Sequence, residues 1–78
     1  MENSPQANAQ LFQQLLTYRM PYGKHQGQLL RQLPIAYLEW FARKGFPEGK
    51  LGILLQSMYE IKLNGLEYLL DEAQTLQK

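Results

Sequence analysis

Residues 51–76 decide the fold, and they read LGILLQSMYEIKLNGLEYLLDEAQTL. Apolar residues recur in this stretch at helical spacing, and their register continues across Asn64-Gly65. An Asn-Gly pair is nevertheless a common place for a helix to end. The pattern therefore allows one long helix over 47–77, bent at Gly65, or two helices, and we favour the long helix.

The far end of such a long helix would extend beyond the domain, and its apolar side chains would need another element to cover them. The helix would extend about 45 Å, which is longer than a domain of this size is wide. A partner subunit would cover the far end, or the chain would fold back at Gly65. The sequence leaves these two solutions open.

Residues 34–44, PIAYLEWFARK, predict a shorter helix before this stretch. Pro34 suits the first helical turn, and Gly45 suits the left-handed position that follows a helix end. The residues expected to face the core, or to flank that face, are Leu38, Phe41, Ala42, Tyr37 and Trp40.

Residues 18–30, YRMPYGKHQGQLL, predict a small β-hairpin with arms at 18–22 and 28–30. Aromatic and apolar residues lie on each side of a turn that runs from Gly23 to Gly27, and Pro21 forbids a helix interior. Pro21 cannot donate a ladder hydrogen bond, so its strand is expected at a sheet edge.

Residues 5–17 predict an N-terminal helix, because Ser4 and Pro5 form a helix start and apolar residues follow at helical spacing. Residues 1–4 are expected to be a disordered tail. At 78 residues the chain is one domain at most. The expected fold class is mainly α within α+β, with an N-terminal helix, a hairpin, a short helix and the long C-terminal helix.

The composition argues against an enzyme. The chain has no cysteine, which excludes disulfides, zinc-thiolate sites and a thiolate nucleophile. It has one histidine, His25, and no set of residues at ligand or triad spacing around it. We therefore expect no catalytic residues, no metal and no cofactor. No signal peptide or membrane span is recognisable, so a cytoplasmic location without a membrane partner is expected.

The net charge of +1 is divided unevenly along the chain. Residues 19–50 carry six Lys or Arg and two Glu, a net +4, whereas residues 51–78 carry two Lys and four Asp or Glu, a net −2. A basic middle hints at an anionic partner, although ordinary solvated surfaces have a similar balance.

The turn of the hairpin is the candidate nucleic-acid-binding site. Its glycines match neither a P-loop nor a dinucleotide fingerprint, but glycine lets a phosphate approach the backbone closely. Cations interleaved with aromatic rings are typical of single-strand binding, although the rings also suit the core of a small domain. The candidate residues are Arg19, Tyr22, Gly23, Lys24, His25, Gly27 and Arg31.

The stretch MPYGKHQGQLLRQLPIAYLEWFARKGFPEGKLG, followed by YEIKLNGLEYLL, resembles a family of short uncharacterised bacterial proteins that are labelled quorum-sensing-regulated virulence factors. The likeness covers roughly residues 18–70. The front half is also similar to a short segment appended to some 3′–5′ exonucleases of the DEDD class. That second resemblance implies a module kept beside nucleic-acid enzymes, without their four catalytic carboxylates. The residues that carry it are Gly23, Lys24, Gly27, Leu33, Pro34, Tyr37, Leu38 and Trp40.

Two functions are therefore open from the sequence. One is a non-catalytic accessory module that binds nucleic acid through the basic hairpin. The other is a protein-interaction or dimerisation module that uses the long C-terminal helix, with the hairpin as scaffold.

Overall fold

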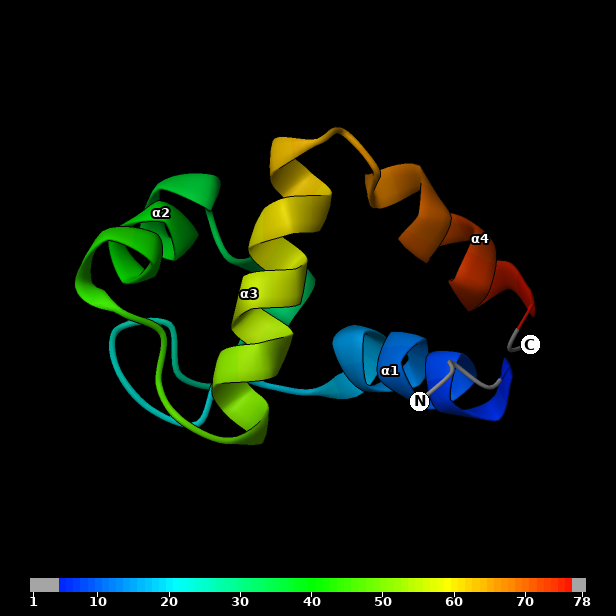
Figure 1. Ribbon diagram of the computed structural model, residues 1–78, viewed down its shortest axis with the longest axis horizontal. Coiled ribbons are helices and arrows are strands. Elements are labelled where there is room, and N and C mark those ends of the chain that lie inside the picture. The colour runs from blue at the N-terminus through cyan, green and yellow to red at the C-terminus, as the bar shows by residue number, and fades with distance from the viewer. Residues whose placement is uncertain (1–4, 77–78) are drawn as a thin grey trace.

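A computed structural model describes the backbone of residues 5–76 and the side chains of residues 10–75 (Figure 1). The tail expected at residues 1–4 lies outside the described residues. Over the described part the chain forms four α-helices and one 3-10 turn, without a β-strand. The expected α+β class is therefore wrong. In chain order the elements are α1 (Pro5–Thr17), η1 (Leu30–Gln32), α2 (Ile35–Lys44), α3 (Lys50–Leu63) and α4 (Glu67–Leu76).

The segment between α1 and η1 forms a loop, so the expected β-hairpin is wrong. Its two sides meet at one isolated antiparallel bridge, between Arg19 and Leu29. The ladder cannot continue toward the turn because Pro21 has no amide hydrogen. It cannot continue the other way because Leu30 already begins η1. Gly23 and Gly27 have φ angles of +85° and +89°, and they turn the chain inside the loop.

The favoured long C-terminal helix is also wrong, because the chain breaks between α3 and α4. Gly65 has a φ of +69°. The Gly65 amide donates to the Lys62 carbonyl at 3.2 Å, and the Leu66 amide donates to the Ile61 carbonyl at 2.8 Å. These two bonds form a Schellman motif, which satisfies carbonyls that a helix end would otherwise leave unpaired. The chain then turns back, and α4 packs against α1.

The core is built around α3, which contacts α1, α2 and η1 (Figure 1). The helical register continues across the break because α3 and α4 bury residues in the same core. Of the face expected to be buried on α2, Leu38 and Phe41 are buried whereas Ala42 is exposed. The side chains with almost no exposed surface are Leu15, Met20, Leu30, Leu33, Leu38, Leu54, Leu55, Met58 and Leu70.

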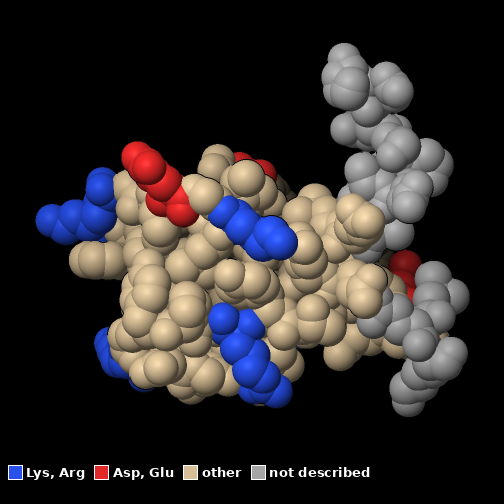
Figure 2. Space-filling view, turned by 90° about the horizontal axis from the view of Figure 1, so that it is seen from below, with Lys and Arg blue, Asp and Glu red and all other residues tan. Residues whose placement is uncertain are grey.

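The charged side chains on one face are spread out rather than gathered. Figure 2 shows Lys and Arg side chains that stand apart from one another, with uncharged surface and an acidic side chain between them. The basic excess of residues 19–50 therefore does not form a continuous positive patch on this face. Among the helices of residues 5–76, none has the length and apolar character needed to cross a membrane.

Candidate functional site

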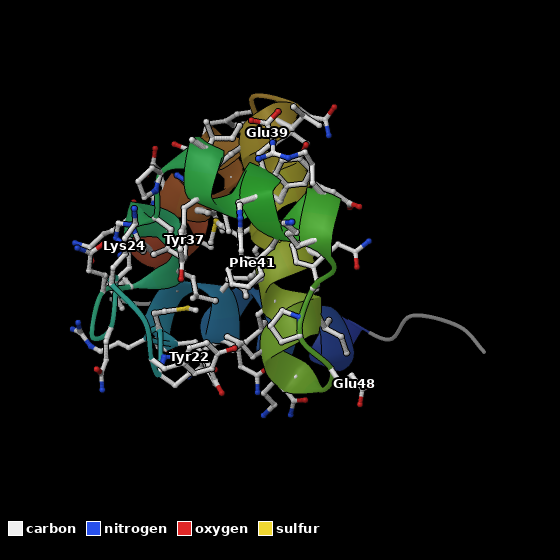
Figure 3. The ribbon with its side chains drawn as sticks, turned by 90° about the vertical axis from the view of Figure 1, so that its left-hand side faces the viewer. Tyr22, Lys24, Tyr37, Glu39, Phe41 and Glu48 are labelled. Atoms are coloured by element: carbon white, nitrogen blue, oxygen red, sulfur yellow. The ribbon has the colours of Figure 1, made fainter. Side chains whose placement is uncertain are left out.

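A groove of about 620 Å³ opens between the loop that follows α1 and helix α2. We call it the aromatic groove. Figure 3 shows Tyr37 and Phe41 in the middle of this face, with Lys24 and Tyr22 to one side and the Glu39 and Glu48 carboxylates at its margins. The lining residues are Tyr22, Gly23, Lys24 and His25 from the loop, and Pro34, Ala36, Tyr37, Trp40, Phe41 and Arg43 from α2 and its start.

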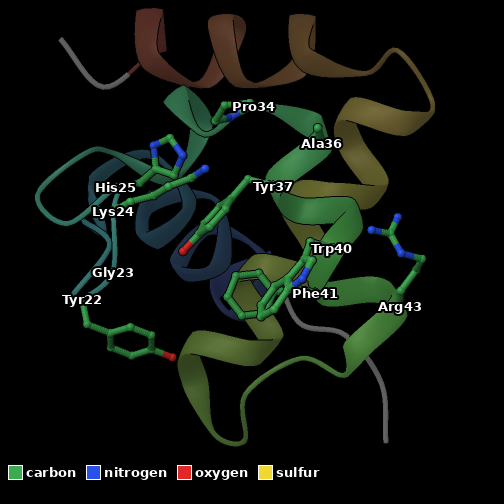
Figure 4. A pocket seen from close by; sticks show the side chains of 10 residues that line it. All are labelled: Tyr22, Gly23, Lys24, His25, Pro34, Ala36, Tyr37, Trp40, Phe41 and Arg43. Atoms are coloured by element: carbon green, nitrogen blue, oxygen red, sulfur yellow. The ribbon is translucent and has the colours of Figure 1, made fainter.

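Tyr37 forms the wall where the loop meets α2 (Figure 4). Its ring centroid lies 4.5 Å from that of His25 and 5.2 Å from that of Phe41, with edge-on geometry in each pair. A Cβ atom on Gly23 would lie only 3.2 Å from the Tyr37 hydroxyl. Burial, and to a smaller extent the nearby Tyr22, raises the pKa of the Tyr37 hydroxyl further above neutral pH than that of an ordinary tyrosine, so the hydroxyl is protonated. The loop thus rests on a neutral aromatic wall.

Two large rings of the groove remain open to solvent. Tyr22 is 49% exposed and Trp40 is 45% exposed. The Trp40 ring lies 5.1 Å from that of Phe41 at an angle of 76°, and such edge-to-face contacts are favourable. Trp40 is therefore packed along one edge while much of its surface stays accessible to a ligand.

The charged groups of the lining are cationic. Lys24 and Arg43 lie toward opposite ends of the groove (Figure 4). No Asp or Glu belongs to the groove lining among the residues that the structure describes. The His25 ring points its Nδ1 atom at the Gln28 side-chain oxygen, 3.2 Å away. The groove therefore combines aromatic surface with positive charge at its two ends.

Four of the seven candidate residues from the sequence line this groove: Tyr22, Gly23, Lys24 and His25. Arg19 does not, because its guanidinium donates to the Gly27 carbonyl at 2.6 Å and so closes the base of the loop. Gly27 also lies outside, and its amide donates to the Met20 carbonyl at 2.8 Å. That amide is therefore not free to bind a phosphate.

Arg31, the remaining candidate, serves the fold. Its guanidinium donates to Asp71 at 2.8 Å and to Gln74 at 3.0 Å, and both partners lie on α4. The Arg31 side chain is only 19% exposed. Because two intramolecular partners occupy it, Arg31 is not available to the groove.

Sequence reasoning did not assign the α2 residues of the groove to the site. Trp40 was expected to flank the core-facing residues of this helix, and neither Ala36 nor Arg43 is among the seven candidate residues. Ala36, Trp40 and Arg43 are spaced four and three residues apart, so they form one stripe of a helix. That stripe lies beside the buried pair Leu38 and Phe41, and its spacing is the signal that could have identified it.

The described residues hold no group of three or more His, Asp or Glu side chains that could bind a metal ion. The fold and the groove define a small helical protein that carries an aromatic groove with a cation toward each end. The chain belongs to the family described as "Putative quorum-sensing-regulated virulence factor", whose profile matches residues 8–73.

Two curated relatives share much of this sequence. The chain is 55% identical over 51 residues to the uncharacterized protein YpeB of Escherichia coli K12, a match that covers 64% of this chain and 71% of the relative. YpeB of Escherichia coli O157:H7 matches with the same identity and coverage. No solved structure matches the chain with statistical significance. The likeness to the exonuclease-associated segment is not shown by these comparisons and stays a prediction.

Proposed function

We propose that this chain is a non-catalytic nucleic-acid-binding module and that the aromatic groove is its binding site. The observation that carries the proposal is the groove itself, in which exposed rings and cations occur together without a lining carboxylate. Proteins that bind nucleic acid through stacking combine the same two elements. The rings supply surface for bases, and the cations supply charge for phosphates.

The cations of the groove are available for a ligand. Within the described residues, Lys24 and Arg43 take part in no hydrogen bond or ion pair. Arg31 and Lys62, in contrast, are bound to carboxylates of α4. The proposal therefore keeps the expected phosphate contact at Lys24, drops Arg19 and Arg31, and takes Arg43 as the second contact.

The argument for dimerisation through the C-terminal helix is weakened by this fold. It rested on a helix too long for the domain to cover. The chain instead folds back after Gly65, and α4 buries Leu70 completely against the rest of the chain. The resemblance to a segment beside 3′–5′ exonucleases, as a prediction, favours the nucleic-acid alternative.

The test is a titration of labelled oligonucleotides, followed by fluorescence anisotropy at about 50 and 200 mM salt. Two phosphate contacts on a single strand give a slope of about −1.4 in log affinity against log salt, or about sevenfold between these concentrations. The double variant Lys24→Ala/Arg43→Ala should bind more weakly and should lose most of this slope.

The matched control is Lys44→Ala/Lys50→Ala, which removes the same charge from two exposed residues outside the groove lining. Its affinity should stay close to that of the unaltered chain. Equal weakening of the two double variants, or no binding at 50 mM salt, would contradict the proposal.

A further inference from the structure

We infer that the aromatic groove takes unpaired nucleotides, with a base stacked on Trp40 or Tyr22 and its phosphate beside Lys24 or Arg43. The inference rests on the proposed function and deepens it. The shared chemistry is a base with a free face and an attached phosphate, which a single strand or a free nucleotide can provide.

The shape of the site favours an unpaired nucleotide over a duplex. A groove of about 620 Å³ lies in the range of sites that enclose small ligands. A duplex is convex and keeps its bases stacked inside, and proteins read it by inserting a helix or a ribbon into its grooves. A concave groove fits a part that projects, and the part of a nucleic acid that projects into such a site is a base out of its stack.

The charge of the site leads to the same choice. A protein that makes about six to ten contacts with duplex phosphates draws a large share of its affinity from them. The groove offers two, Lys24 and Arg43, and Arg19 and Arg31 are held by intramolecular hydrogen bonds. With so few phosphate contacts, most of the binding free energy has to come from base stacking, which needs unpaired bases.

The rings available for stacking are Trp40 and Tyr22. Each has close to half of its surface exposed, and they belong to different elements, α2 and the loop. The Tyr37 ring is less free, because it contacts His25 and Phe41. Figure 4 shows Tyr37 between the side of the groove that carries Tyr22 and the side that carries Trp40. A base therefore has an accessible aromatic surface at either side.

The experiment uses Trp40 as its own probe, because it is the one tryptophan of the chain. Its emission is followed while the full chain is titrated with (dA)8, with a blunt duplex of eight base pairs and with dAMP, and anisotropy of labelled strands gives the affinities. We expect (dA)8 to quench the emission and the duplex to leave it unchanged. If dAMP quenches the emission at the same concentration as (dA)8, a free nucleotide is the ligand. If (dA)8 binds more tightly than dAMP, a single strand is the ligand. Each of these results supports the inference.

Variants separate stacking from mere attraction. Trp40→Ala should lower the affinity for (dA)8 by about 5- to 140-fold, the range for loss of one base–aromatic stack, and Trp40→Phe should recover most of it. Tyr68→Ala is the matched control, because Tyr68 is an exposed ring on α4 outside the groove lining. Circular dichroism checks that each variant is folded, and Tyr22→Ala replaces Trp40→Ala as the stacking test if that variant does not fold.

The outcomes distinguish this inference from the proposed function. If the duplex binds as tightly as (dA)8, or if neither Trp40→Ala nor Tyr22→Ala lowers the affinity, the inference is overturned and the proposed function stands. If no probe binds at 50 mM salt, the two fall together.

Discussion

Gly23 and Gly27 have nearly the same backbone conformation but different surroundings. Their φ angles are +85° and +89°, a region that L-residues enter at a cost. A Cβ on Gly23 would crowd the Tyr37 hydroxyl at 3.2 Å, whereas nothing lies within 4 Å of a Cβ on Gly27. Since the Tyr37 ring is packed against His25 and Phe41, it has little room to move. Gly23 therefore sets how closely the loop approaches the wall of the groove.

This difference predicts unequal effects of two identical substitutions. Gly27→Ala should lower the free energy of unfolding by about 1–2 kcal/mol, the cost of the backbone conformation alone. Gly23→Ala should cost about 1 kcal/mol more, because its methyl group also displaces the Tyr37 hydroxyl. Urea unfolding followed by circular dichroism measures this, and Tyr37→Phe in the Gly23→Ala background should remove the extra loss. Equal losses for the two alanines would show that the contact is unimportant.

At the scale of elements, a glycine determines how the connection from α2 enters α3. Gly52 is buried in the first turns of α3. A Cβ built on it would overlap the carbonyl oxygen of Pro47, which lies in that connection. Glycine inside a helix costs about 1 kcal/mol relative to alanine. Here its lack of a side chain lets the Pro47 backbone lie directly against the helix.

An ordinary glycine-to-alanine change in a helix raises the free energy of unfolding, whereas we expect Gly52→Ala to lower it. We expect a loss of about 3 kcal/mol in unfolding free energy, because the connection has to move away from α3. The comparison is Gly65→Ala, where φ is +69° and a Cβ meets open space, so the expected loss is about 1–2 kcal/mol. A thermal or urea melt in which Gly52→Ala matches or exceeds the stability of the unaltered chain would refute the close approach.

At the scale of the whole molecule, α3 lies between the groove and the packed helices α1 and α4. The groove lies on the side of α2, and α4 packs with α1 on the other side (Figure 1). Lys62 helps to hold α4 there, because its ammonium donates to the Arg31 carbonyl at 2.8 Å and to Glu67 at 2.7 Å. The Lys62 side chain is 13% exposed. Its loss would leave a partly buried carbonyl and a carboxylate without their donor.

Lys62→Met should therefore loosen α4 without changing the groove. We expect the free energy of unfolding to fall by about 1–3 kcal/mol and amide hydrogen exchange along α4 to become faster. The affinity for an oligonucleotide should stay unchanged. Lys50→Met is the control, since Lys50 is exposed at the start of α3 and should alter neither exchange nor affinity. If Lys62→Met lowered the affinity for the oligonucleotide as well as speeding amide exchange along α4, the two sides of the molecule would not be independent.

Local chemistry made part of this structure readable from the sequence. Helix starts and stops are set by residues within one turn of the boundary, and residues 5–17 and 35–44 are helical close to the expected ranges. Positive φ at Gly23 and Gly27 follows from backbone sterics in the same way. Tyr22, Gly23, Lys24 and His25 could be placed in one site because they are consecutive.

The error over the C-terminal helix arose because periodicity records an apolar face but not the element that covers it. Asn64-Gly65 could bend or break a helix equally well, and packing of α4 on α1 made it a break. Residues 18–30 have aromatic and apolar residues on each side of a glycine-bounded turn, as a hairpin does, yet Pro21 and the start of η1 left room for a single bridge.

The sequence by itself determined the local turns, the helical segments around them and the aromatic and basic character of the middle of the chain. Tertiary structure alone decided which cations are available, because Arg31 is bound by an acidic partner 40 residues away, whereas Lys24 has no such partner within the described part of the chain. It also decided which rings form a site, because Trp40 and Tyr22 line one groove only once α2 has packed beside the loop. The physical reason is that the charge or the aromatic ring of a side chain is fixed by the residue type, whereas its availability to a ligand depends on contacts made across the fold.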